Sequence, residues 1–181
     1  IIGDPDRLRA VAEDFIKHYE TRVAEGATVA GKAMFVCSNR NIAYDFYKIV
    51  KELRPEWTEK KICDDGVVLS EKDKKELKPM EKIKLVMTRN KDDEKDLFDM
   101  LGTKEDRKEF DRQFKNPKSN FKIAIVVDMW LTGFDVPELD TIYIDKPIQQ
   151  HTLIQTISRV NRVCEGKDKG LIVDYIGIKK N

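Results

Sequence analysis

The chain has 181 residues, enough for one domain with a full core, and its 37% charged and 40% hydrophobic residues exclude a disordered chain. Its 34 Lys and Arg against 33 Asp and Glu give a formal charge of +1, which excludes a globally basic surface for nucleic acid. No apolar run is long enough to span a membrane. Three scattered cysteines and two histidines exclude a disulfide framework or a zinc cluster, so we expect a reducing cytoplasm and no metal ligands.

The first part of the chain predicts a helix, a strand and a second helix. An Asp-Pro start and apolar residues at helical spacing predict a helix over Asp4–Gly26. Ala33–Cys37 is a short apolar run that predicts a buried strand, and Asn39 can cap the helix that follows. The charged, poorly periodic stretch Pro55–Met80 predicts an irregular insertion or a mobile loop. Because the chain begins at Ile1 rather than Met, we expect a fragment of a longer polypeptide.

The rest of the chain alternates strands and helices. Charged helices are expected over Asp93–Leu101 and Lys104–Lys115. Four further apolar runs predict strands, at Ile83–Thr88, Phe121–Val127, Thr141–Asp145 and Leu171–Tyr175. This alternation predicts a three-layer α/β/α sandwich around a mainly parallel sheet. We divide the chain into an N-terminal helix and connector, residues 1–31, and a domain of residues 32–181.

Two segments imitate nucleotide-site motifs. GATVAGKA, Gly26–Ala33, is one residue short of a phosphate-binding loop, but it ends a helix and begins a strand, which is the reverse of the order that such a loop requires. DEKD, Asp93–Asp96, resembles a magnesium-binding acidic box, yet four residues separate it from the preceding strand. We therefore interpret the first as a turn and the second as an ordinary helix start.

The segment Gln155–Arg162 has the most informative pattern. On a helix, Gln155, Ser158, Arg159 and Arg162 fall on one face, and apolar residues fall on the opposite face. The two arginines have no acid at i±4, so we expect them to meet an anion brought from elsewhere, and a guanidinium suits phosphate. The same pattern also describes a solvated helix face whose cations pair with distant acids.

Three loops that follow expected strands hold small polar side chains. They are Ser38-Asn39-Arg40, Thr88-Arg89 and Asp128–Pro137. Polar side chains at a helix start can hold a phosphate, Gly133 allows close backbone approach, and Asp135 can accept a hydrogen bond from a ribose hydroxyl. Taken one at a time, these polar residues are also explained by helix capping and turn formation, without any ligand. Because the carboxyl ends of parallel strands share one edge, we expect the loops to meet there and the two arginines to face that rim.

Together these segments resemble the second RecA-like domain of a superfamily 2 helicase. AMFVCSNRNIAYDFY (33–47) resembles motif IV, IVVDMWLTGFDVP (125–137) resembles motif V, and QTISRVNR (155–162) resembles motif VI. The order and spacing match over about 130 residues, which is far more specific than one motif. TGFDVPELDTIYIDKP, HTLIQTISRVNR and GKDKGLIVDYIG closely resemble the restriction (R) subunit of type I restriction–modification enzymes.

The resemblance implies a role for each site residue. ATP would lie between this domain and a preceding RecA-like domain that holds the phosphate loop and the magnesium-binding acids. Arg162 and Arg159 would act as arginine fingers, and Gln155 would orient phosphate or water. Gly133 and Asp135 would contact the ribose. DNA-backbone contacts are implied for Ser38, Asn39, Thr88 and Thr132.

The resemblance also implies partners and an activity for the intact enzyme. The partners are duplex DNA, ATP with Mg²⁺, the preceding RecA-like and nuclease domains of the same chain, and methylase and specificity subunits. The intact enzyme would hydrolyse ATP to translocate DNA and cleave it at a distance, while this fragment alone is expected to be inactive. Glu165-Gly166-Lys167 matches an E-x-K nuclease triplet, but such triplets arise by chance in so charged a chain, so we assign no nuclease residue.

Two positions depart from the usual helicase pattern. Val127-Asp128 stands where many helicases have Thr-Asp, and Ser158 replaces the usual glycine of motif VI. The residues leave two alternatives open. One is a domain of another superfamily 2 DNA or RNA helicase, and the other is a non-catalytic α/β module that binds nucleic acid or protein.

Overall fold

Five parallel strands form the central sheet of the computed structural model, which describes residues 1–131, 135–160 and 170–176. The strand order is β2-β3-β1-β4-β5, and every neighbouring pair is parallel, as the sequence predicts. The strands are β1 (Ala33–Cys37), β2 (Ile83–Leu85), β3 (Ile123–Val126), β4 (Thr141–Asp145) and β5 (Leu171–Asp174). Four of them are buried along their whole length, which explains their continuous apolar sequence.

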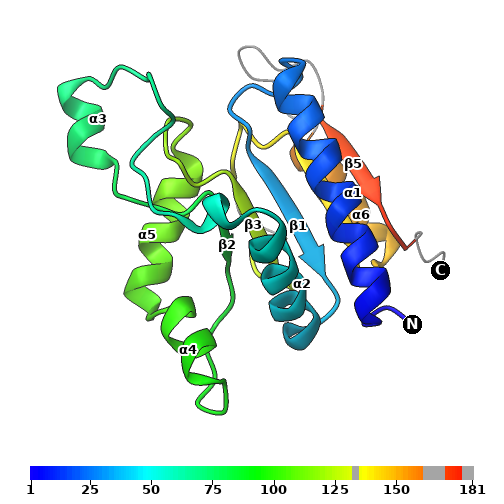
Figure 1. The fold of residues 1–181 in the computed structure, drawn as a ribbon. Helices are drawn as coiled ribbons and strands as arrows, with labels where there is room; N and C mark the ends of the chain where they lie inside the picture. Colours follow the sequence, from blue (N-terminus) through cyan, green and yellow to red (C-terminus); the bar gives the residue numbers. More distant parts are fainter. Residues whose placement is uncertain (132–134, 161–169, 177–181) are drawn as a thin grey trace.

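Helices cover both faces of this sheet, so the predicted three-layer sandwich is confirmed (Figure 1). The helices α1 (Pro5–Ala24) and α2 (Arg40–Leu53) pack on one face, where Phe35 stacks on Phe46 with ring centroids 3.9 Å apart. The helices α5 (Lys104–Lys115) and α6 (Gln150–Val160) contribute to the core on the other face. The short helix α4 (Lys95–Leu101) buries Leu97 and Leu101 in the α1 and α2 core.

The N-terminal helix belongs to the core rather than to a detached linker. Asp4 caps α1 by accepting a hydrogen bond from the Arg7 N–H, as the Asp-Pro start predicts. Phe15 on α1 is fully buried, and its ring centroid lies 4.7 Å from that of Tyr143 in β4. An edge-on aromatic contact of this kind adds to simple burial. The division of the chain at residues 31 and 32 stays a prediction.

The stretch Pro55–Met80 is less irregular than the sequence predicts. It contains the 3₁₀ helix η1 (Pro55–Thr58) and the helix α3 (Glu71–Glu76), and a β-bridge joins Lys61 to Met80. Trp57, Leu77 and Met80 are buried. These anchors are single apolar residues without helical or strand periodicity, which is why the sequence pattern missed them.

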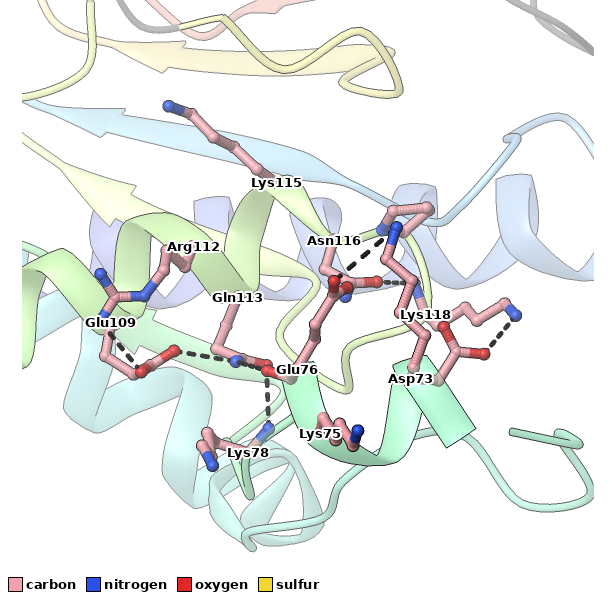
Figure 2. Close-up of a pocket in the computed structure, with 12 residues that line it drawn as sticks. Asp73, Lys75, Glu76, Lys78, Glu109, Arg112, Gln113, Lys115, Asn116 and Lys118 are labelled. Carbon is pink, nitrogen blue, oxygen red and sulfur yellow. Dashed lines mark hydrogen bonds and ion pairs between the residues drawn. The ribbon is translucent and has the colours of Figure 1, made fainter. Parts of the chain in front are cut away.

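A buried glutamine fixes α3 and the chain after it to α5. The Gln113 side chain is 1% exposed; its amide nitrogen donates to the main-chain oxygen of Glu76 and to the Glu109 carboxylate, both at 2.9 Å. Its oxygen accepts from the Lys78 N–H at 3.2 Å. Figure 2 shows Gln113 between these partners. The two partly buried bonds to Glu76 and Lys78 hold the insertion against α5, and the bond to Glu109 within α5 orients the Gln113 amide.

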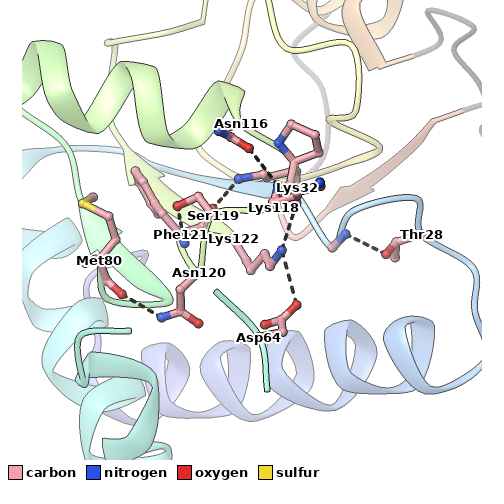
Figure 3. A network of polar contacts seen from close by, with 12 residues as sticks. Thr28, Lys32, Asp64, Met80, Asn116, Lys118, Ser119, Asn120, Phe121 and Lys122 are labelled. Atoms are coloured by element: carbon pink, nitrogen blue, oxygen red, sulfur yellow. Dashed lines mark hydrogen bonds and ion pairs between the residues drawn. The ribbon is translucent and has the colours of Figure 1, made fainter. Parts of the chain in front are cut away.

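The GATVAGKA segment is a turn at the amino edge of the sheet, as expected. Lys32 is fully buried, and its Nζ donates to the Phe121 oxygen at 2.6 Å and to the Gln113 oxygen at 3.4 Å. Figure 3 shows this edge, where Lys122 donates to Pro117 and pairs with Asp64 at 3.5 Å. The motif lysine therefore meets main-chain carbonyls inside the protein, where a phosphate has no access.

Candidate functional site

The predicted DNA-contact loops meet at the carboxyl edge of the sheet. The β1 arrow points toward this edge in Figure 1, and α3 lies at the opposite end of the molecule. Ser38 and Asn39 follow β1, and Thr88 follows β2. Thr88 and Asn39 are exposed, and Ser38 is half-buried. The structure thus places these three residues where the sequence predicts, while Thr132 lies outside the described residues.

Ser38 and Asn39 already have partners within the fold. The Ser38 hydroxyl donates to the Asp145 main-chain oxygen at 3.0 Å, and Asn39 Oδ1 accepts from the Ile42 N–H at 2.9 Å as the cap of α2. Capping therefore explains Asn39 by itself. It also turns the exposed amino end of a 14-residue helix toward the same edge, and such an end favours anions.

Arg40 links two neighbouring loops, which the sequence did not predict. Its guanidinium donates to both carboxylate oxygens of Asp93, at 2.7 and 2.8 Å, and to the Thr88 oxygen at 2.5 Å. Burial raises the pKa of Asp93, but hydrogen bonds from the Asn90 N–H and from Arg40 outweigh it and hold this pKa below its ordinary value. The first acid of the DEKD segment is therefore a structural partner of Arg40.

A cavity of about 370 Å³ lies between these loops. Its wall includes Arg40, Thr88 and Asp128, which follow three neighbouring strands. A larger hollow of about 730 Å³, between α3 and α5, lies near the amino side of the sheet (Figure 2). There the acids Asp73 and Glu109 pair with Lys118 and Arg112. Of the two, the carboxyl-edge cavity is the one that a predicted contact residue, Thr88, lines.

The dipeptide Asp145-Lys146 joins this edge to α1. Arg7 donates to both carboxylate oxygens of Asp145, at 2.6 and 3.1 Å, and also to the oxygens of Ile2 and Tyr175. The Asp145 side chain is fully buried, and this hydrogen bond raises the pKa of Arg7. Lys146 donates to the Val127 oxygen at 3.0 Å and to Asp128. The end of β4 therefore contacts the loops after β1 and β3 together with the N-terminal helix.

The loop after β3 has an unusual backbone. Trp130 has a φ of 68°, which is uncommon for a bulky side chain, and its ring stacks on Phe114 of α5 at 5.3 Å. Further along, Asp135 is exposed, while Val136 and Leu139 are buried. Gly133 lies outside the described residues. The structure therefore places Asp135 at the surface next to two core residues in the sequence, and its ribose contact stays a prediction.

The helix α6 has the predicted two faces along its described part. Gln155 and Ser158 are exposed, and Leu153 and Val160 are buried. Thr156, which the sequence left unassigned, is buried, and its hydroxyl donates to the Thr152 oxygen. The Arg159 side chain, Arg162 and residues 165–167 lie outside the described part of the chain.

The direction of α6 bears on the expected single rim. The helix begins after the carboxyl end of β4, and its last residue, Val160, lies beside Gly170 at the amino end of β5. An ideal Cβ built on Gly170 comes within 2.0 Å of the Val160 oxygen. A helix between parallel strands must run back along the sheet. The loops that follow the strands therefore share the carboxyl edge, as predicted. The described part of α6 runs from this edge toward the amino edge.

The fold is of the RecA-like α/β type that helicase domains have. It is similar to the second domain of the DEAD-box helicase Mss116p bound to an RNA duplex, with a TM-score of 0.51 and 16% identity over 94% of this chain and 49% of that one. It is also similar to a fragment described as the HsdR subunit of a type I restriction enzyme from Vibrio vulnificus YJ016. That match has a TM-score of 0.57 and 14% identity and covers 94% of this chain and 28% of that one.

Sequence similarity gives the particular family. The family described as type I restriction enzyme subunit R domain 3 matches residues 29–177, and the chain belongs to it. The HindI endonuclease subunit of Haemophilus influenzae, a type I restriction enzyme subunit, is 38% identical over 183 residues. That alignment covers 99% of this chain and 16% of the relative, so this chain spans about a sixth of the relative's length. No helix among the described residues is long and apolar enough to cross a membrane.

Proposed function

We propose that this chain is the second motor domain of the endonuclease subunit of a type I restriction enzyme. The observation that carries the proposal is the family match over residues 29–177, together with the loops that the fold gathers at one sheet edge. The intact enzyme would couple ATP hydrolysis to translocation of duplex DNA and would cleave that DNA. This domain would supply half of the ATP site and half of the DNA track.

On the nucleotide side, the chain would offer charge and orientation rather than a complete site. Arg159 and Arg162 would stabilise the charge that develops on the γ-phosphate, a contribution worth roughly 10³–10⁵ in rate in other phosphoryl-transfer enzymes. Gln155, which is exposed on α6, would orient phosphate or water, and Asp135 and Gly133 would contact the ribose. Mg²⁺ would be bound mainly by a preceding RecA-like domain.

On the DNA side, the contacts would read the backbone rather than the sequence. Ser38, Asn39 and Thr88 lie at the carboxyl edge, and Thr132 would join them there. Hydroxyl and amide groups at a helix start fix the register of a duplex without distinguishing bases. Other parts of the enzyme, including methylase and specificity subunits, would supply recognition in the cytoplasm of the host cell.

A domain of another DNA or RNA helicase is the second candidate. The likeness to Mss116p concerns the fold alone at 16% identity, whereas the HindI subunit is 38% identical over nearly the whole chain. This difference favours the restriction enzyme. A non-catalytic binding module predicts no ATPase defect from any substitution in this chain, so the experiment below separates it from both motors.

The substitution Arg162→Ala in the full-length subunit tests the proposal. We expect loss of DNA-stimulated ATPase by at least two orders of magnitude, because a finger acts only on transition-state charge, while nucleotide binding is largely retained. Arg9→Ala, a change at a half-exposed arginine of α1, is the matched control and should leave the rate unchanged.

Two outcomes would contradict the assignment. Unchanged DNA-stimulated ATPase activity in Arg162→Ala would contradict the role of Arg162 as an arginine finger. Steady ATP turnover by the purified 181-residue chain would show that the ATP site does not need a second domain. Both are measured as phosphate release with and without duplex DNA.

A further inference from the structure

Three ion pairs among the described residues of the carboxyl edge differ sharply in the exposure of their acids. Asp145, the partner of Arg7, has a fully buried side chain, and Asp93, the partner of Arg40, is 10% exposed. Asp128, the partner of Lys146, is 85% exposed. An exposed pair contributes little to stability, whereas breaking a buried pair leaves an uncompensated charge. Lys146 is therefore the cation of the three that can most readily exchange its partner.

The surroundings of Lys146 suit a phosphate. Its own side chain is 21% exposed, so the ammonium is held in place and still reaches solvent. Its Nζ is fixed on one side by the Val127 oxygen, which leaves the Asp128 carboxylate as the exchangeable partner. Asp128 also lines the 370 Å³ cavity beside Thr88, one of the predicted backbone contacts. The Asp128 carboxylate therefore pairs with an anchored lysine beside an open cavity, at the position that an anionic ligand would occupy.

We propose that Lys146 binds a DNA-backbone phosphate and that Asp128 occupies this position until DNA replaces it. The inference rests on the proposed function and adds a cation to a predicted contact set that otherwise contains only Ser, Asn and Thr. Backbone phosphates are contacted most often by Lys and Arg, and each such contact releases condensed counterions. The exchange involves no covalent step, because one ion pair replaces another.

The exchange also gives the DNA a physical connection to the loop after β3. Asp128 begins the segment that contains Trp130, with its strained φ of 68°, and continues to Asp135, the predicted ribose contact. When a phosphate displaces Asp128, this segment loses the tie from Asp128 to β4. The Trp130 ring stays stacked on Phe114, so the exchange would free the Asp128 end of the described part of this loop.

Lys146→Met and Asp128→Asn in the full-length subunit test the inference in opposite directions. We measure binding of a non-specific duplex over a salt titration without nucleotide. Lys146→Met should weaken binding roughly five- to tenfold at 0.1 M salt and reduce the salt slope by about one, as the loss of one phosphate contact requires. Asp128→Asn should strengthen binding about two- to fivefold, because it removes the competing carboxylate. The double variant should bind like Lys146→Met alone.

The exposed pair Asp45 and Lys48 on α2 provides matched controls. Its atoms lie 3.5 Å apart, and neither Asp45→Asn nor Lys48→Met should change affinity or slope. Unchanged binding by Lys146→Met would overturn the inference, as would weaker binding by Asp128→Asn. Melting temperatures within 2 °C of wild type for both site variants exclude unfolding as the cause. If the unaltered subunit failed to bind duplex DNA at all, the proposed function itself would fall.

Discussion

The two edges of the sheet use charged side chains in opposite ways. At the amino edge, Lys32 is fully buried and bonded to main-chain oxygens, and Lys122 is 8% exposed. At the carboxyl edge, Arg7, Arg40 and Lys146 each pair with an acid that ends or follows a different strand. The amino edge is thus closed by desolvated lysines, and the carboxyl edge is a set of linked polar loops.

This difference indicates which edge serves stability and which serves ligands. The buried Lys32 donates to main-chain carbonyls of the fold, and these bonds fix the turn between α1 and β1. An ion pair between loops can exchange one member for a ligand, and the free-energy cost of breaking the pair depends on how buried the acid is. The carboxyl edge contains both kinds, from the buried Asp145 to the exposed Asp128.

The largest expected effect tests whether the carboxyl edge also carries stability. Arg7→Met leaves the buried Asp145 carboxylate without its main partner, and breaking such a pair costs about 3 kcal/mol of unfolding free energy. Because Arg7 is 27% exposed, we take the lower end of that range. Urea unfolding of the 181-residue chain measures the change. Arg9→Met is the control and should differ from wild type by less than about 0.5 kcal/mol.

Adding Asp145→Asn to Arg7→Met should recover part of the lost stability, because it removes the unpaired charge. A change below about 0.5 kcal/mol in Arg7→Met alone would mean that this pair is no more than a surface contact.

A smaller effect tests the amino edge through its dependence on pH. Burial, with a contribution from Lys122, holds the pKa of Lys32 well below its ordinary value of 10.5. Between that lowered pKa and 10.5, the unfolded chain binds more protons than the folded chain. The free energy of unfolding therefore rises with pH over this range. Lys32→Met removes this rise. It also leaves the Phe121 oxygen without its donor, so at alkaline pH the variant should be less stable by about 1–2 kcal/mol.

Urea unfolding at neutral pH and near pH 10 measures this difference, which should narrow toward neutral pH. Lys104→Met, at an exposed position of α5, is the control for general effects of alkali. If the difference in unfolding free energy between wild type and Lys32→Met widened as the pH fell, folding would favour the charged ammonium, which contradicts a lowered pKa of Lys32.

The elements of the fold could be predicted because each carries a local signal. Short apolar runs marked the strands, Asn39 marked the start of α2, and the predicted bounds of α5 match the structure. The packing of α1 carried no such signal, since its amphipathic pattern predicts a buried face without naming the surface it meets. The partner of Arg7 lies 138 residues away in the sequence.

The candidate site was predicted in part for the same reason. The sequence placed Ser38 and Thr88 at one edge because both follow expected strands of a parallel sheet. It missed Lys146, because a lysine before a proline reads as a loop residue, and it missed the role of Arg40 because Asp93 lies 53 residues away. The Arg159 side chain and Arg162 lie outside the described residues, so their expected place at that rim stays a prediction.

The smallest expected effect separates the two kinds of pair within the carboxyl edge itself. Asp128→Asn should change the unfolding free energy by less than about 0.5 kcal/mol, because an acid that is 85% exposed gives a pair screened by water and salt. Urea unfolding in low and high salt measures this change beside that of Arg7→Met. A loss approaching that of Arg7→Met would show that Asp128 holds the fold together, and an acid needed for folding could not give way to a phosphate. A negligible loss, combined with altered DNA binding in the full-length subunit, would place Asp128 among residues kept for exchange rather than for stability.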